Sequence, residues 1–268
     1  MAAVPPAFVA AFSAGSTTFE QLQLAVLEAF FWGALASSSL LLGGVLALNL
    51  RLSHRLIGLV MGFGAGVLIS AVAFELFAEA AASVENRNSA ATGLFAGSLT
   101  FFAGDALIDR MGGEERKSMV GRQAGGVALA IVLGIVLDGI PESFVVGMGL
   151  VDGGGVSVAF IVAVFLSNLP EAAAASSGLR DSGWNTSRIY LLWVVVSLVA
   201  GLAAALGYGV FSDASRDAVA FVLAFAAGAI LTMLADTMMP EAFEQGGRAV
   251  GLLTTLGFGL AFAIGTLD

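Results

Sequence analysis

The chain has 268 residues, of which 58% are hydrophobic and only 12% charged, and it contains no cysteine. Soluble domains carry about 25% charged residues, so this composition favours a lipid environment. The lack of cysteine excludes a disulfide framework and a thiolate metal site. We therefore expect the lipid bilayer as the main partner, and no nucleic acid.

The N-terminal segment differs from a cleavable signal peptide. Residues 1–20 contain no Lys or Arg, whereas a signal peptide begins with a basic region. We expect residues 1–20 to form a short tail with an interfacial turn, and residues 1–268 to form a single transmembrane domain.

Eight apolar runs follow, each bounded by charged residues or by Gly and Asn. Each is about long enough to cross a bilayer as a helix, and none shows the alternation of a membrane β-barrel. The fold class expected is an all-α membrane protein with eight transmembrane helices. The expected spans are 22–48, 56–81, 90–108, 124–151, 156–176, 189–211, 218–237 with a wet extension to about 244, and 248–267.

The basic residues predict the orientation of these spans. Nine of the eleven Lys and Arg residues fall in odd-numbered loops: Arg51, Arg55, Arg110, Arg116, Lys117, Arg122, Arg180, Arg188 and Arg248. Only Arg87 and Arg216 fall on the other side. Because cytoplasmic loops are enriched in Lys and Arg, both termini are expected outside a multi-pass cell membrane, plasma or bacterial inner.

Two similar segments indicate an internal repeat. Aligning Gly66 with Gly228 brings Glu79-Ala80 onto Glu241-Ala242. The two spans concerned would cross the membrane in opposite directions, which predicts an inverted repeat. In this 3+2+3 arrangement, spans one to three are related to spans six to eight, and spans four and five lie at the centre. Many transporters have this symmetry and bind substrate at the repeat interface. The glycines themselves predict close helix packing.

Three prolines are each followed directly by glutamate, as Pro141-Glu142, Pro170-Glu171 and Pro240-Glu241. A proline within a helix leaves the carbonyl four residues earlier without its N–H donor. In hydrocarbon that carbonyl needs another partner, such as water or a cation. The first two pairs therefore place a backbone oxygen next to a carboxylate inside a span.

Polar neighbours accompany two of these glutamates. Asp138 lies four residues before Glu142, and Asn168 lies three before Glu171, so each pair shares a helix face. A charged carboxylate at the bilayer centre costs about 3 kcal/mol or more, and no Lys, Arg or His lies mid-span to offset it. Such carboxylates are protonated or hold a cation, and these four residues are the predicted metal ligands.

Other polar residues are candidates for an ion pathway. Asp236 and Glu241 lie near the cytoplasmic end of the seventh span, and Glu75 lies near the outer end of the second. Ser167 precedes the second of the Pro-Glu motifs and is a further candidate. Asp105 is interpreted as a helix-end carboxylate.

At these motifs the sequence resembles the ZIP family of metal-ion transporters (Zrt- and Irt-like proteins). The fourth span of that family commonly carries His-Asn-x-Pro-Glu-Gly, and the fifth carries a second copy or a variant. Here the corresponding stretches read Asp138-Gly139-Ile140-Pro141-Glu142-Ser143 and Ser167-Asn168-Leu169-Pro170-Glu171-Ala172. The resemblance implies eight spans, outside termini and transport of a divalent metal such as zinc, iron or manganese into the cytoplasm. It also implies a homodimer as one assembly state.

The chain departs from the family pattern at the metal ligands. Asp138 and Ser167 stand at the two histidine positions, and Gly139 at an asparagine position. The sixth-span motif Ala-Glu-Pro-Leu is replaced by Ala203-Ala204-Ala205-Leu206, and the usual His-rich loop is missing. An all-oxygen site is better suited to magnesium, calcium or manganese than to zinc. We thus expect one divalent ion as substrate, with selectivity shifted away from zinc, and no bound cofactor or enzymatic activity.

Two alternatives remain from the sequence. One is a ZIP-like protein that no longer transports and acts as a membrane scaffold or regulatory partner. The other is an intramembrane aspartyl protease using Asp138 and Asp236, which would require the two aspartates close together in mid-membrane.

Overall fold

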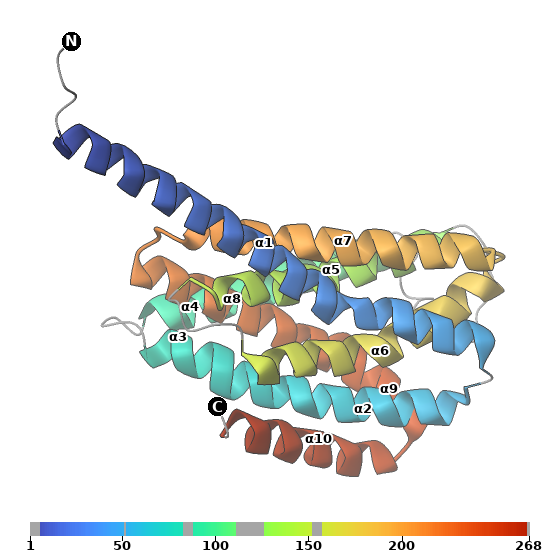
Figure 1. The fold of residues 1–268 in the computed structure, drawn as a ribbon. Helices are drawn as coiled ribbons and strands as arrows, with labels where there is room; N and C mark the ends of the chain where they lie inside the picture. The colour runs from blue at the N-terminus through green and yellow to red at the C-terminus, as the bar shows by residue number, and fades with distance from the viewer. Residues whose placement is uncertain (1–5, 51, 83–87, 111–125, 152–156, 267–268) are drawn as a thin grey trace.

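The computed structural model describes residues 6–50, 52–82, 88–110, 126–151 and 157–266, and all regular structure in these ranges is helical (Figure 1). Three basic residues of the expected third loop (Arg116, Lys117 and Arg122), together with Arg51 and Arg87, lie outside the described residues. In chain order the helices are α1 (Pro6–Asn49), α2 (His54–Ala71), η1 (Val72–Phe77), α3 (Ala78–Ala82), α4 (Asn88–Arg110), α5 (Gly126–Met148), α6 (Val158–Asp181), α7 (Thr186–Phe211), α8 (Arg216–Met233), η3 (Leu234–Met238), α9 (Met239–Gly246) and α10 (Ala249–Gly265).

Six helical stretches in the described part of the chain are long and apolar enough to cross a membrane. They are Glu20–Asn49, His54–Ala82, Asn88–Arg110, Val158–Asp181, Thr186–Phe211 and Arg216–Gly246. The chain therefore has the character of a helical, multi-pass membrane protein. The other two expected spans correspond to α5 and to the 17-residue α10, which are not among these six.

Polar caps explain where several helices begin. The side chains of Ser53, Ser157, Asn185 and Ser215 each accept a hydrogen bond from the backbone N–H three residues later. Such a cap satisfies one of the N–H groups that a helix start leaves without a partner. At the N-terminus α1 already begins at Pro6, so most of the expected tail is helical. Proline is tolerated in the first turn, and the alanines that follow favour helix.

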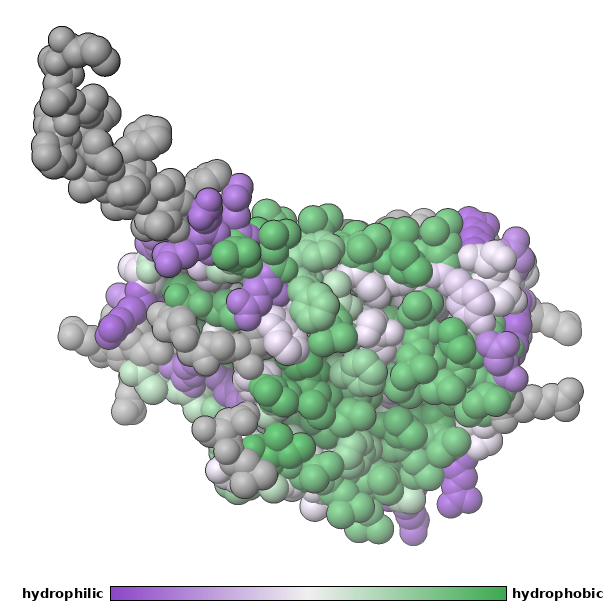
Figure 2. All heavy atoms as spheres, in the orientation of Figure 1, coloured by the Kyte–Doolittle hydropathy of each residue, from purple (hydrophilic) through white to green (hydrophobic). Residues whose placement is uncertain are grey.

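The surface of the bundle fits a bilayer. Large aliphatic and aromatic side chains are exposed along the helices, including Leu99 and Leu252, which are 67% and 71% exposed. Figure 2 shows a broad hydrophobic band between more hydrophilic ends. The turns after α1, α6 and α9 lie at one end of the bundle, whereas the end of α3, the turn after α7 and the end of α10 lie at the other (Figure 1).

The predicted similarity of the second and seventh spans extends to their secondary structure. Helices α2 and α8 both follow a capping serine, both have 18 residues, and both continue directly into a π-helix. When Gly66 is aligned with Gly228, the first residues of the two helices coincide, and so do the first residues of η1 and η3. The two segments run in opposite directions (Figure 1).

Glycines bring the two segments against partners from opposite halves of the chain. A Cβ at Gly66 of α2 would meet the carbonyl of Thr254 in α10, and a Cβ at Gly257 of α10 would meet that of Phe63. The second segment has matching contacts, between Gly228 of α8 and Leu94 of α4, and between Gly97 of α4 and Phe225. The prediction that these glycines serve close packing is confirmed.

Candidate metal site

Both Pro-Glu motifs expected inside spans lie within continuous helices. Pro141 is inside α5, and Pro170 is inside α6. The carbonyl of Leu166, which cannot accept from Pro170, lies beside Gly64 of α2, where an added Cβ would be 3.2 Å from that oxygen. Glycine at this position therefore leaves room next to the carbonyl that the proline frees.

The carboxylate of Glu142 is buried deep in the bundle. The residue is 2% exposed, and its Oε2 atom has no hydrogen-bond partner among the described residues. Asp138 lies one helical turn before it, close enough for electrostatic repulsion between the two carboxylates. An unsatisfied buried carboxylate oxygen is costly, so this position favours a proton or a cation.

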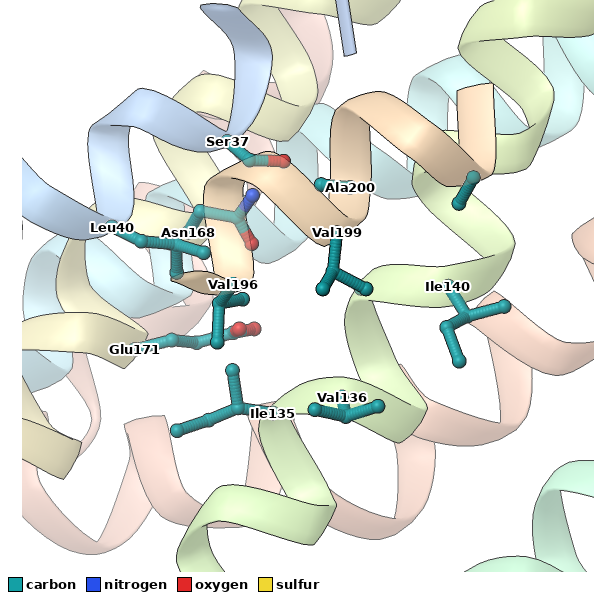
Figure 3. A pocket seen from close by; sticks show the side chains of 12 residues that line it. Ser37, Leu40, Ile135, Val136, Ile140, Asn168, Glu171, Val196, Val199 and Ala200 are labelled. Carbon is teal, nitrogen blue, oxygen red and sulfur yellow. The ribbon is translucent and has the colours of Figure 1, made fainter. Parts of the chain in front are cut away.

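Asn168 and Glu171 line a cavity enclosed by α1, α5, α6 and α7. Its volume is about 20 Å³, and by the same measure a single water needs about 10–15 Å³. Figure 3 shows the side chains of Asn168 and Glu171 on one side of this cavity, with Ser37 of α1 next to Asn168. The cavity thus has room for one water-sized group beside a carboxylate and an amide.

Two of the four predicted ligands line this cavity, and two do not. Asn168 and Glu171 line the cavity, whereas Asp138 and Glu142 are not among its lining residues. Within the ranges that the structure describes, no group of three or more His, Asp or Glu side chains is placed to hold a metal ion. Asp138, Glu142 and Glu171 therefore do not form such a group in this conformation.

The position of the family's sixth-span glutamate is closed by packing. Ala204 is fully buried, with its carbonyl against Gly147 of α5 and its Cβ against Gly33 of α1. No longer side chain fits at Ala204. Its neighbour Ala203 lines the cavity.

The pathway candidates have different surroundings. Ser167 is fully buried, and its hydroxyl donates to the carbonyl of Val164 at 3.0 Å. Asp236 is exposed within η3, and Glu241 accepts a hydrogen bond from Gln245 at 3.1 Å. Glu75, in η1, accepts a hydrogen bond from Ser157 at the start of α6.

Asp105 differs from its interpretation as a helix-end carboxylate. It lies inside α4, five residues before the last residue Arg110, and is 4% exposed. Because helix ends are difficult to place from apolar runs alone, the sequence put this residue too close to the end.

Two features of the site were not expected from sequence. Ser37 lines the cavity from α1, and the run Ser37-Ser38-Ser39 in mid-span is the signal that could have indicated it. Gly139 also lines the cavity, and a Cβ there would meet nothing within 4 Å. The absence of a side chain at Gly139 helps to keep the cavity open.

The chain was compared with protein-family models and with curated sequences. No protein-family model matches the chain, and no curated sequence is significantly similar to it.

Proposed function

We propose that this protein transports a divalent metal ion across the cell membrane into the cytoplasm. The observation that carries the proposal is the Glu142 carboxylate, which is buried in a proline-containing helix with one oxygen lacking a hydrogen-bond partner among the described residues. Asp138 adds a second negative group one turn away. A cation in transit offsets this buried charge, whereas a purely structural acid would be hydrogen-bonded.

The proposed architecture has eight spans, with α5 and α10 completing the set, an inverted 3+2+3 repeat and both termini outside. The shared layout of α2-η1 and α8-η3 supports the repeat. Arg55 lies in the first turn of α2, Arg180 in the last turn of α6, and Arg248 between α9 and α10. These helix ends lie at the end of the bundle opposite the end of α10 (Figure 1), which supports a cytoplasmic assignment of that end.

The proposed route passes the four predicted ligands in mid-membrane. The ion enters near Glu75, loses water between α5 and α6, and leaves past Asp236 and Glu241. Because Asp138, Glu142 and Glu171 do not form a three-residue metal group in this conformation, we expect metal binding to involve a rearrangement of α5 and α6. Rocking of one repeat against the other is a known way to produce such a change in transporters.

The resemblance to ZIP transporters at the Pro-Glu motifs gives further support. On this resemblance, the protein would be a carrier rather than an enzyme, and the metal ion would be its transported substrate. The same proposal includes a homodimer.

The direct experiment measures cellular metal content by mass spectrometry across a panel of divalent ions. Cells producing the wild-type protein should accumulate at least one ion, and cells producing the Glu142→Ala/Glu171→Ala protein should not. Asp181→Asn, at the exposed end of α6, is the matched control and should retain accumulation. No accumulation of any ion by well-expressed wild-type protein would contradict the proposal.

The ligand set predicts the selectivity of transport. All four proposed ligands provide oxygen, which suits manganese and magnesium better than zinc. In competition experiments, excess manganese should therefore suppress uptake of the transported ion more strongly than excess zinc does. A strict preference for zinc would contradict an oxygen-only site.

A second candidate function is a ZIP-like scaffold without transport. The observation in its favour is that Asp138 and Ser167 stand at the two positions where the motif commonly carries histidine. Normal membrane assembly of a protein that moves no metal would favour this candidate. The protease alternative has no such support, because Asp236 is exposed in η3 rather than buried beside Asp138.

A further inference from the structure

The cavity beside Glu171 has mostly aliphatic walls, apart from one polar side. Six aliphatic residues surround it: Leu40, Ile135, Val136, Ile140, Val196 and Val199. The polar side chains among its lining residues are Ser37, Asn168 and Glu171. Apolar walls with a few polar groups at one side are typical of sites for small amphiphilic ligands.

The mouth of the cavity belongs to the apolar side of the bundle. Ile140 of α5 and Val199 of α7 line the cavity and are 47% and 42% exposed. Val195 and Leu202, one turn to either side on α7, are also exposed. In a bilayer, exposed aliphatic side chains in mid-helix face lipid, so the cavity opens toward the hydrocarbon rather than toward either aqueous end.

Packing at one end of the α5–α7 pair explains the opening. The two helices contact closely where Gly147 lies against Ala204 and Gly207 lies against Phe144. About two turns earlier in α5, Gly139 contributes no side chain, and a Cβ at this position would meet nothing within 4 Å. The gap between α5 and α7 is thus left unfilled at the depth of Glu171.

We propose that this lateral cavity binds lipid-soluble alkylamines. The ammonium group, about the size of a water molecule, fits the 20 Å³ space and pairs with the Glu171 carboxylate. The alkyl chain lies over Ile140 and Val199 in the lipid. This ligand is distinct from the transported ion, and its binding does not depend on transport.

The test uses dicyclohexylcarbodiimide, a hydrophobic reagent that modifies carboxyl groups reached from lipid. The protonated acid adds across one C=N bond, and an acyl shift gives a stable N-acylurea on the glutamate. In membranes containing wild-type protein, mass spectrometry should find the adduct on Glu171 and not on Glu142. Dodecylamine added first should abolish the N-acylurea, because the bound amine excludes the reagent or takes the acyl group of the activated Glu171 as a dodecylamide, with dicyclohexylurea leaving. Water-soluble tetramethylammonium should do neither. No adduct on Glu171, or labelling that dodecylamine leaves unchanged, would overturn the proposal.

A substitution at the mouth gives an independent result. Gly139→Leu fills the open space without changing Glu171, and the adduct should be lost. Gly251→Leu is the matched control, since Gly251 lies exposed on α10 and a Cβ there also meets nothing within 4 Å. Its labelling should equal that of the wild type. Equal labelling of the Gly139→Leu protein would show that the reagent takes another path and would overturn the lateral site. The dodecylamine result in the wild type stands even if Gly139→Leu fails to fold.

Discussion

Metal uptake by cells producing the Glu142→Gln protein should fall to the level of cells without the protein. Glutamine keeps the size and shape of the side chain but removes its negative charge. At the bilayer centre, no water is present to replace the lost carboxylate as a ligand of the dehydrated divalent ion. The binding free energy that the carboxylate contributed is therefore lost. Uptake of the metal identified by the panel, measured over the first minutes, is the appropriate readout.

Two controls make this result specific. Asp181→Asn carries the same loss of one charge at an exposed position and should transport normally. Size-exclusion profiles of the two proteins in detergent should match that of the wild type, because Glu142→Gln adds no volume to the core. Normal uptake by a well-folded Glu142→Gln protein would remove Glu142 from the pathway and leave Glu171 as the remaining candidate.

The second large effect concerns packing between the two halves of the chain. Gly97→Ala should lower the stability of the protein by about 1–3 kcal/mol, the usual cost of inserting a methyl group into a filled core. The new Cβ would meet the backbone carbonyl of Phe225, which cannot move aside as a flexible side chain could. Thermal unfolding in detergent, followed by loss of the monodisperse peak, measures the difference.

Gly259→Ala is the control for this prediction. Gly259 is also in a helix, exposed on α10, and a Cβ there would meet nothing within 4 Å. The Gly259→Ala protein should be as stable as the wild type or slightly more stable, because glycine is a poorer helix former than alanine. Equal stability of the two variants would contradict the close approach of α4 and α8.

The sequence predicted the helices well because a bilayer leaves few alternatives. Backbone groups in hydrocarbon must bond within the segment, so a long apolar run becomes a helix. The expected wet extension of the seventh span to about 244 corresponds to η3 and α9, which end at Gly246. The similarity of the second and seventh spans was visible because Gly66 and Gly228 have equivalent packing roles.

The arrangement of the ligands was harder to predict. The spacing of Asp138 and Glu142 shows that they share a face of α5, but not which helix this face meets. That depends on the rotation of α5 about its axis, which is set by distant contacts such as Gly147 with Ala204. Sequence reasoning therefore grouped the four residues as ligands of one site, and of these Asn168 and Glu171 line the cavity. The π-helices were also missed, since a single wider turn leaves no mark in an apolar run.

The matching positions of η1 and η3 bear on the history of the chain. A π turn accommodates one residue more than an α turn, and in both halves this turn starts directly after an 18-residue helix. If the two halves arose by duplication, one insertion before the duplication would account for both turns. Insertions after the duplication would have had to occur independently at the same position in both halves. On the proposed inverted repeat, the ancestor was a three-span protein that entered membranes in either direction. On that proposal the ancestor would have carried little charge bias, and the asymmetry of Lys and Arg in the present chain would have arisen after the two copies were fused.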